Sequence, residues 1–281
     1  MTISDELTRI QTAKADIKAS IEAKGVTVPS SALIDTYDTY IGQISGGGGG
    51  QAEEDLKNLI EMDITSITIP NGTTKIGAFA FYYNRGLTSV IIPDSVTSIG
   101  RQAFGMCLSL TSVIIGNGVT SIGQQAFYQC SGLTSIDIPS GVTSIGQQAF
   151  QQCSGLTSIT IGSGVTSIGQ EAFDDCSSLT SVTIGSGVTS IGRSVFYNCS
   201  KLTSITIPDS VTSIGDSAFR YCSSLTSVTI EAVTPPTLSS SSAFSNTNNC
   251  PIYVPAESLE AFKTATNWSS LASRIQPIPT E

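Results

Sequence analysis

The sequence contains no histidine and few charged residues. Without histidine, mechanisms that use an imidazole as general base, such as the Ser-His-Asp triad, are excluded. Charged residues make up 12% of the chain, well below the share in ordinary globular proteins, so hydroxyl side chains must form much of the surface. Lysine and arginine form no cluster. The sequence therefore lacks the basic patch with which proteins bind nucleic acids.

Long apolar runs and export signals are missing as well. No stretch approaches the roughly 18 continuous apolar residues of a membrane-spanning helix. The first residues, MTISDELTRIQ, place Asp5 and Glu6 where a secretory signal requires a positive segment and then an apolar one. The sequence thus predicts neither membrane insertion nor export by the ordinary secretory route. The formal net charge of −9 is concentrated in residues 1–63, which hold eleven acids and five bases.

What the sequence does contain is a repeat of 23 residues. Seven copies run from residue 64 to residue 224, and an eighth opens at Leu225. The repeated leucines are Leu87, Leu110, Leu133, Leu156, Leu179, Leu202 and Leu225. The repeated phenylalanines are Phe81, Phe104, Phe127, Phe150, Phe173, Phe196 and Phe219. Such a period predicts stacked units, each of which buries its apolar face against its neighbours.

Each unit, such as LTSIDIPSGVTSIGQQAFQQCSG, predicts three segments. In the first, Ile136 and Ile138 alternate with polar residues, the period of two that indicates a strand with one buried side. The proline or glycine after this strand predicts a turn, and Gly146 predicts a second corner. Ala149 and Phe150 then place a small and a large apolar side chain in what we expect to be a short helical or 3-10 turn.

The pattern L-x-x-I-x-I, V-x-x-I-G, A-F-x-x-C resembles the BspA-type leucine-rich repeat over residues 64–230. The first unit departs from the pattern at Thr73 and Asn84, where later units have valine and cysteine. The resemblance implies an α/β repeat fold, a leucine-rich-repeat solenoid of 23-residue units between a short helical N-terminal module and a C-terminal cap. It also implies a surface protein of gut or oral bacteria or of their phages.

Both ends of the chain differ from the repeat. We expect the solenoid at 64–232 and its C-terminal cap at 233–281. This cap has a strand at Ile252–Val254, a helix opened by Pro255 and Glu257, and Trp268 and Leu271 over the last coil. Phe244 and Cys250 fall out of the 23-residue register, as in an atypical end repeat.

The N-terminal part divides into three segments. Residues 1–45 are expected to form a helical, oligomerising or virion-attachment module, because apolar residues there follow a 4-3 spacing. Residues 46–51 form a glycine-rich linker and residues 52–63 a helical cap. The segment DELTRIQTAKADIKASIEAKGVTVPSSALIDTYDTYIGQI resembles the N-terminal segment of tail and tail-fibre proteins of tailed phages and prophages. That resemblance implies a protein of the virion tail, assembled in the host cytoplasm.

Several patterns invite a chemical interpretation. Six cysteines recur at the 23-residue step without the paired spacing of a zinc site, and we expect a column of buried thiols. The string IGSGVTSIG lacks the lysine of a phosphate-binding loop and is interpreted as a corner. A pair of carboxylates could hydrolyse a glycoside. The clustered acids are Glu171, Asp174, Asp175 and Asp216, which we interpret as a solvated surface.

Binding residues are sought where the repeats differ from one another, beside the phenylalanine and after the glycine corner. Tyrosine, arginine, asparagine, aspartate and glutamine there are typical of adaptable recognition surfaces, although an unconstrained surface explains them equally well. The candidate ligand-contact residues are Tyr82, Tyr83, Arg101, Tyr128, Asp174, Asp175, Arg193, Tyr197, Arg220 and Tyr221.

A second exposed feature is a ladder of hydroxyl side chains on the strands. Such a ladder stabilises a sheet, but it could also contact sugars or order water at an ice surface. Its members are Ser135, Ser158, Ser181, Ser204 and Ser227 beside Thr160, Thr183, Thr206 and Thr229.

The sequence thus predicts a non-enzymatic recognition protein without cofactor or metal. In the favoured interpretation it is a tail-fibre-like protein of a phage or prophage that binds a bacterial surface glycan or protein. It forms a homo-oligomer through residues 1–45, and a trimer would suit a fibre. The alternatives are a BspA-type bacterial adhesin at the cell surface, a structural spacer of a tail or baseplate, and a carbohydrate-active enzyme that uses the scattered acids.

Overall fold

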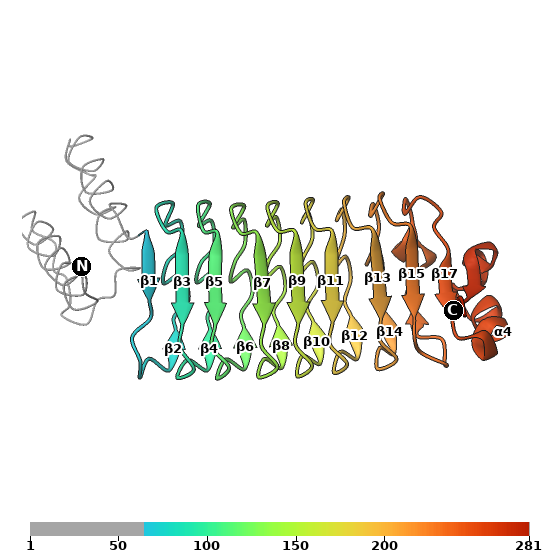
Figure 1. Cartoon of the computed structure of the whole chain (residues 1–281), viewed down its shortest axis with the longest axis horizontal. Helices are drawn as coiled ribbons and strands as arrows, with labels where there is room; N and C mark the ends of the chain where they lie inside the picture. Colours follow the sequence, from blue (N-terminus) through green and yellow to red (C-terminus); the bar gives the residue numbers. More distant parts are fainter. Residues whose placement is uncertain (1–64, 281) are drawn as a thin grey trace, which may run out of the picture.

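The structure, a computed structural model, describes residues 65–280. The segments predicted at 1–45, 46–51 and 52–63 lie outside the described residues. In the described part the chain winds into a solenoid of parallel strands, whose coils lie side by side along one long axis (Figure 1). The 23-residue repeat and the solenoid are therefore as the sequence predicts.

One side of the solenoid, the strand face, carries the longer strand of each coil. Within it, Ile136 and Ile138 are buried while Ser135 and Asp137 are exposed, as the alternation in the sequence predicts. Neighbouring strands pair one repeat apart. These strands are β1 (Ser66–Thr68), β3 (Ser89–Ile92), β5 (Ser112–Ile115), β7 (Ser135–Ile138), β9 (Ser158–Ile161), β11 (Ser181–Ile184), β13 (Ser204–Ile207) and β15 (Ser227–Ile230).

The strand face is not one continuous sheet. Hydrogen bonding joins β1, β3 and β5, then β7, β9 and β11, and then β13 and β15 with two strands of the C-terminal end. The ladder is thus interrupted after β5 and after β11. Val182 and Ile184 of β11 are less deeply buried than the same positions of β9, because the next strand lies less closely against them.

A second, unbroken sheet of eight parallel strands follows the first turn of each coil (Figure 1). Each strand has only two residues, a polar one that is exposed or half-buried and a buried apolar one. They are β2 (Lys75–Ile76), β4 (Ser98–Ile99), β6 (Ser121–Ile122), β8 (Ser144–Ile145), β10 (Ser167–Ile168), β12 (Ser190–Ile191), β14 (Ser213–Ile214) and β16 (Thr237–Leu238).

The glycine corner after each short strand is explained by close stacking. A Cβ atom added to Gly146 would lie 2.6 Å from the backbone nitrogen of Gln124 and 2.6 Å from the carbonyl carbon of Gly123 in the preceding coil. Its φ angle is ordinary. The corner therefore requires glycine because two backbones approach each other there, and not because the chain turns through a left-handed conformation.

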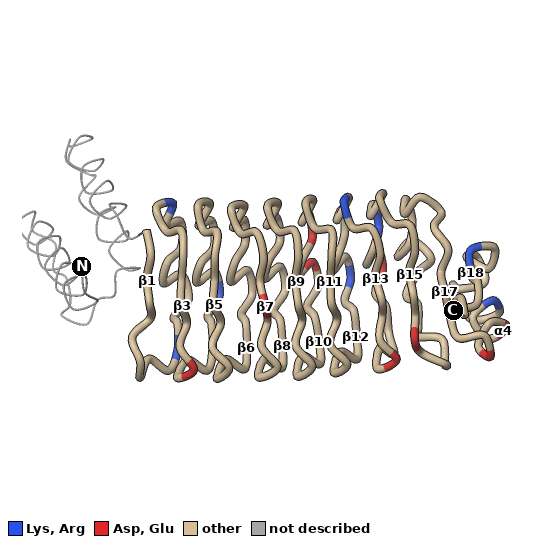
Figure 2. Tube along the Cα trace, viewed as in Figure 1, with Lys and Arg blue, Asp and Glu red and all other residues tan. Residues whose placement is uncertain are grey.

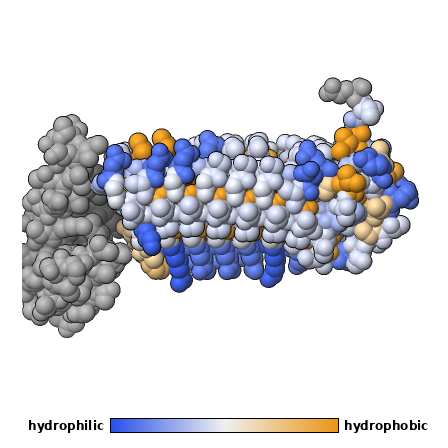
Figure 3. All heavy atoms as spheres, turned by 90° about the horizontal axis from the view of Figure 1, so that it is seen from below, coloured by the Kyte–Doolittle hydropathy of each residue, from blue (hydrophilic) through white to orange (hydrophobic). Residues whose placement is uncertain are grey.

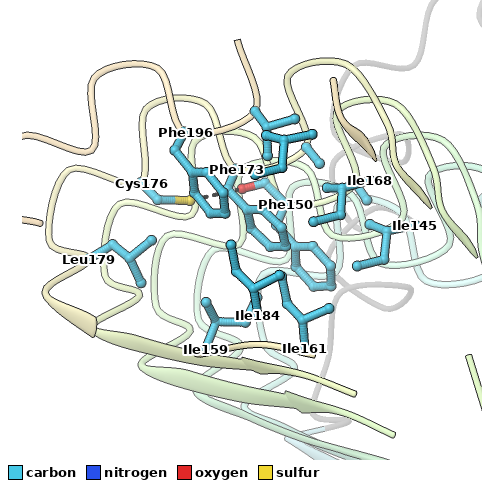
Figure 4. Packing of buried hydrophobic residues seen from close by; sticks show 14 of the residues in the cluster. Ile145, Phe150, Ile159, Ile161, Ile168, Phe173, Cys176, Leu179, Ile184 and Phe196 are labelled. Carbon is cyan, nitrogen blue, oxygen red and sulfur yellow. Dashed lines mark hydrogen bonds between the residues drawn. The ribbon is translucent and has the colours of Figure 1, made fainter. Parts of the chain in front are cut away.

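The core is a column of phenylalanine rings along the axis. Phe127 and Phe173 stack on the two sides of Phe150, with ring centroids 5.1 and 5.2 Å away. Figure 4 shows the rings of Phe150, Phe173 and Phe196 in this column. Isoleucines of both sheets and the leucine that precedes each longer strand surround the rings, and nearly all of these side chains are buried. Because each ring contacts one in the coil before and one in the coil after, the column couples the coils to one another.

The third segment of each coil contradicts the expected helical or 3-10 turn. Around Phe150 the chain makes successive turns, in which the N–H of Ala149 donates to the carbonyl of Gly146 at 3.3 Å. The N–H of Phe150 donates instead to the carbonyl of Ala172 in the next coil at 2.8 Å. Bonds between coils thus replace the bonds of a helix, and the α/β class is wrong for residues 65–280. The fold there is a β-solenoid with little helix.

The C-terminal end departs from the 23-residue coil and contains most of the helical residues. Its strand β17 lies at Ile252–Val254, where the sequence predicts a strand, and pairs with β15. Trp268 is fully buried and Leu271 nearly so. Among the described residues no helix is long and apolar enough to cross a membrane. The remaining elements are η3 (Ser241–Phe244), η4 (Ala256–Ser258), α4 (Leu259–Thr264), η5 (Ser269–Arg274) and β18 (Ile275–Pro277).

Candidate recognition surface

The side of the solenoid between the glycine corner and the cysteine of each coil is called the turn face, and residues 147–152 form it in the coil of Phe150. Two residues of every turn face have positive φ angles, and in this coil they are Gln148 at 57° and Gln152 at 60°. Glycine holds neither position in any complete coil. The N–H of Gln152 donates to the carbonyl of Asp174 in the next coil at 2.8 Å, so bonding along the axis holds the unusual conformation in place.

Side chains at these positive-φ positions form columns along the axis, because the same position recurs in every coil. In the first column, Nε2 of Gln125 donates to Oε1 of Gln148 at 3.0 Å. Nε2 of Gln148 in turn donates to Oε2 of Glu171 at 2.7 Å. The turn face is thus a polar surface whose side chains orient one another through hydrogen bonds from coil to coil.

The second column forms one wall of an open groove of about 500 Å³, called the amide groove. This wall consists of Gln129, Gln152, Asp175 and Asn198, from four successive coils. The other wall consists of Leu108, Ser131, Ser154 and Ser177, which follow the cysteines. Nε2 of Gln129 donates to Oε1 of Gln152 at 2.6 Å, and Nδ2 of Asn198 donates to Oδ1 of Asp175 at 2.7 Å.

Charged side chains are sparse along the coils, and several acids lie in the coil of Asp174 (Figure 2). Oδ2 of Asp174 accepts a hydrogen bond from Gln151 at 2.7 Å, while its buried Oδ1 has no partner among the described residues. The pKa of Asp174 is raised to about 6, mainly by burial and also by the nearby carboxylates of Asp175 and Glu171, against the lowering effect of the Gln151 bond.

This raised pKa makes a prediction for stability against pH. Between the ordinary value of 3.8 and the folded value of about 6, the folded protein binds more protons at Asp174 than the unfolded chain does. The contribution of this group to the free energy of unfolding therefore falls as the pH rises through that window. We expect Asp174→Asn to reduce the loss of stability between these pH values, as measured by urea unfolding at each pH. Equal pH profiles for the two proteins would contradict the assignment.

The ten candidate residues from the sequence do not form one site. Tyr82 and Tyr83 lie at the N-terminal end of the solenoid, where both are exposed and Arg85 lies over the ring of Tyr83. Arg101 lies over the ring of Phe79 in the same region. In the view of Figure 3, apolar side chains gather at the two ends of the array, and most of the middle is near neutral in hydropathy, with small apolar patches. Tyr82, Tyr83 and Phe79, at the N-terminal end of the solenoid, form a first aromatic cluster.

A second cluster lies four coils or more further along the chain. The rings of Tyr197 and Tyr221 meet edge to face, with centroids 5.3 Å apart. The guanidinium of Arg220 lies 5.0 Å from the centre of the Tyr221 ring, and its buried Nε has no partner among the described residues. Tyr128 is half-buried and belongs to neither cluster, and Arg193 is exposed. Asp174 lies in the acidic coil, and of the ten only Asp175 lines the amide groove.

Sequence reasoning therefore missed most of the groove. The missed residues are Leu108, Gln129, Ser131, Gln152, Ser154, Ser177 and Asn198. Their common signal is their position next to a repeated cysteine: three lie directly before the cysteine and four directly after it. When the repeats are aligned at the residue directly before the cysteine, they show the column Gln129, Gln152, Asp175 and Asn198. Asparagine and glutamine fit a recognition surface too, but the ten candidates contain only tyrosine, arginine and aspartate, so Asp175 is the one groove residue among them.

The hydroxyl ladder of the strand face is present but interrupted. Ser158 lies opposite Ser181 and Thr160 opposite Thr183 in β9 and β11. Between β11 and β13 the sheet is broken, so the serines and threonines of the last coils belong to another sheet. The ladder is therefore not one regular lattice over the whole strand face, as a match to an ice surface would require.

The repeated cysteines are buried and free, as the sequence predicts. The thiol of Cys176 donates to the carbonyl of Phe150 at 3.3 Å (Figure 4), and the other five repeated thiols make the equivalent bond. Burial raises the pKa of Cys107 and Cys222 to about 12, so the thiols are neutral. Within residues 65–280, no group of three histidine, cysteine or carboxylate side chains is arranged to hold a metal ion.

Comparison with known proteins identifies the repeat. The model of the BspA-type leucine-rich repeat region matches residues 59–177 and 143–270. No curated protein matches the chain. A leucine-rich repeat protein of T. pallidum is similar in structure, with 29% identity and a TM-score of 0.53 over 57% of this chain and 78% of that one. A leucine-rich repeat protein from Bacteroides ovatus has 26% identity and a TM-score of 0.52 over 69% of this chain and 64% of that one.

The matched region contains the strand face, the turn face and the amide groove. The two overlapping matches together cover well over half of the chain, and the pattern they describe is the one whose leucines, isoleucines and phenylalanines form the core. The chain belongs to the BspA-type leucine-rich repeat family.

Proposed function

We propose that this protein is a non-enzymatic recognition protein, whose turn face binds a glycan or a protein on a bacterial surface. The observation that carries the proposal is the variation among otherwise uniform coils. The first position of every longer strand on the strand face is serine, from Ser66 to Ser227. One position of the turn face, in contrast, holds Tyr128, Gln151, Asp174 and Tyr197 in four successive coils. Tyrosine, amide and acidic side chains on a rigid scaffold suit specific binding, and a spacer needs no such variation.

The hydrogen bonds of the acids argue against a role in hydrolysis. Glu171 accepts a hydrogen bond from Gln148, Asp174 from Gln151, and Asp175 from Asn198, each in a neighbouring coil. A hydroxyl of Ser242 donates to Asp216 at the C-terminal end. The four carboxylates that could serve a glycosidase thus each connect one coil to the next, which is a structural use.

The proposal also concerns the setting of the array, that is, whether a phage tail or a bacterial cell surface carries it. In a phage or prophage tail, residues 1–45 would mount the array, hold it as a homo-oligomer and leave the turn face displayed. This part rests on the sequence resemblance of residues 1–45, which lie outside the described residues. Family membership favours a second setting, a BspA-type adhesin of the bacterial cell surface. The same turn face would bind in either setting.

Retention of the labelled full chain on a panel of bacterial strains tests the proposal. We expect retention on a restricted set of strains. Replacement of Tyr128, Tyr197 and Tyr221 together by serine is expected to reduce this retention, because the substitution removes aromatic contact area from the turn face. Replacement of Ser158, Ser181 and Ser204 by alanine on the strand face is the matched control and should leave retention unchanged. If no strain retains the chain, the array is a spacer and the proposal fails.

The setting is tested separately. An antibody against the array should label the tails of particles released by prophage induction if the protein is tail-fibre-like. Labelling of the intact bacterial cell surface without labelling of particles would establish the adhesin setting instead.

A further inference from the structure

The amide groove contains a gap in its column of hydrogen bonds. Gln129 donates to Gln152, and Asn198 donates to Asp175. Between Gln152 and Asp175, which come from neighbouring coils, no side-chain hydrogen bond is present among the described residues. In the same two coils the neighbouring columns are bonded, from Gln148 to Glu171 and from Gln151 to Asp174, both at 2.7 Å. The gap is therefore specific to the column that lines the groove.

The gap leaves a donor and an acceptor side by side. Oε1 of Gln152 is used by Gln129, so the Nε2 group of Gln152 keeps both of its N–H donors. Oδ1 of Asp175 is used by Asn198, so Oδ2 remains an acceptor. Both side chains are half-buried in the wall of the groove. A ligand hydroxyl between them could accept from Gln152 and donate to Asp175 at the same time.

The rest of the groove narrows the class of ligand. Its opposite wall presents the hydroxyls of Ser131, Ser154 and Ser177. The only charged side chain that lines it is Asp175, next to the acids Asp174 and Glu171 in the same coil, so an anionic ligand would be repelled. Leu108 is the only apolar side chain in the lining, whereas a peptide ligand needs pockets for its apolar side chains.

We propose that the amide groove binds a neutral oligosaccharide along the axis of the solenoid, with a sugar hydroxyl in the gap between Gln152 and Asp175. The amide and serine walls supply alternating donors and acceptors for further hydroxyls in successive coils. This inference rests on the proposed recognition function and names the ligand class and the contact residues of that surface. A protein ligand is the other outcome that the experiment below distinguishes.

The first experiment applies the labelled full chain to an array of neutral and acidic oligosaccharides. We expect binding to neutral members only. The dissociation constant of the tightest one is then measured by calorimetry for the native chain, Gln152→Ala, Asp175→Asn and the control Thr160→Ala. Thr160 is exposed on the strand face, outside the turn face, and does not line the groove. We expect about a tenfold loss or more for Asp175→Asn, which removes a charged acceptor, and a smaller loss for Gln152→Ala. The control should be unchanged.

Several outcomes separate this inference from the proposed function. Binding of a neutral oligosaccharide that neither groove variant weakens, while both keep native circular dichroism, would overturn the placement in the groove. Retention on cells that protease treatment abolishes and periodate oxidation of glycans does not would show a protein ligand and overturn the glycan class. Either result leaves the recognition function standing. A chain that is retained by no strain and binds no oligosaccharide overturns both.

Discussion

Replacement of Phe150 by alanine is expected to lower the free energy of unfolding by about 3–5 kcal/mol. Phe150 is fully buried, and its ring lies 5.1 Å from that of Phe127 and 5.2 Å from that of Phe173. The substitution removes one ring from the middle of the column and leaves a cavity between two coils. Backbone hydrogen bonds hold those coils at a fixed spacing, so the cavity cannot collapse without breaking them. Urea unfolding of the full chain, followed by far-ultraviolet circular dichroism, measures the loss.

Two further variants make this prediction specific. Gln147→Ala changes an exposed side chain in the same coil and should alter stability by no more than about 0.5 kcal/mol. Phe150→Leu keeps most of the apolar volume but removes the ring. Its loss in free energy of unfolding should lie between the losses of Phe150→Ala and Gln147→Ala. Because an array is stabilised by its coils and the interfaces between them, the cavity should also separate the unfolding of the two halves into two phases. A single transition with less than about 1 kcal/mol of loss for Phe150→Ala would show that the column does not couple the coils.

The phenylalanine column of the core is also the part of the fold that could best be predicted from the sequence. A residue that recurs at a fixed step must occupy the same place in each stacked unit, so the periods of phenylalanine, leucine and isoleucine predicted both the solenoid and its core. The alternation at Ile136 and Ile138 predicted the strand that the structure contains. These inferences needed only the period and the burial of apolar side chains, which do not depend on the detailed path of the backbone.

The turn face could not be predicted in the same way. Gln-Gln-Ala-Phe is compatible with a helical turn, and no glycine marks the left-handed positions at Gln148 and Gln152. The conformation is decided by bonds to the next coil, such as that from Gln152 to Asp174. Those bonds exist only after the coils stack. A local propensity was therefore overridden by contacts between residues about one repeat apart.

The candidate site shows the same limit. The column of Gln129, Gln152, Asp175 and Asn198 is readable once the repeats are aligned by position. The gap within it is not readable, because the same pair of residue types, Gln151 and Asp174, occurs in the neighbouring column and is hydrogen-bonded there. Whether two side chains meet depends on their rotamers and on the backbone that carries them, and the sequence contains neither.

The end of the column carries the second large prediction. Phe244 is two residues out of the repeat register, yet its ring stacks on Phe219 at 5.4 Å, so the longer connection before it is accommodated outside the core. Trp268 then lies 5.7 Å from Phe244 and meets Phe262 edge to face at 5.1 Å. Its Nε1 donates to the carbonyl of Pro236 at 2.7 Å. Trp268 is therefore the last ring of the column and closes it against solvent.

Trp268→Ala is expected to cost about 3–5 kcal/mol and to make the chain prone to self-association, because it uncovers the apolar end of a stack of coils. Trp268→Phe is the matched control. It keeps a ring against Phe244 but loses the hydrogen bond to Pro236, and should cost about 1 kcal/mol more than a swap of apolar volume alone. Circular dichroism must follow the unfolding, since Trp268 is the only tryptophan of the chain. Size-exclusion chromatography of both variants measures association. If Trp268→Ala is as stable and as monodisperse as Trp268→Phe, the end of the column is closed by the backbone of the C-terminal segment and not by this ring.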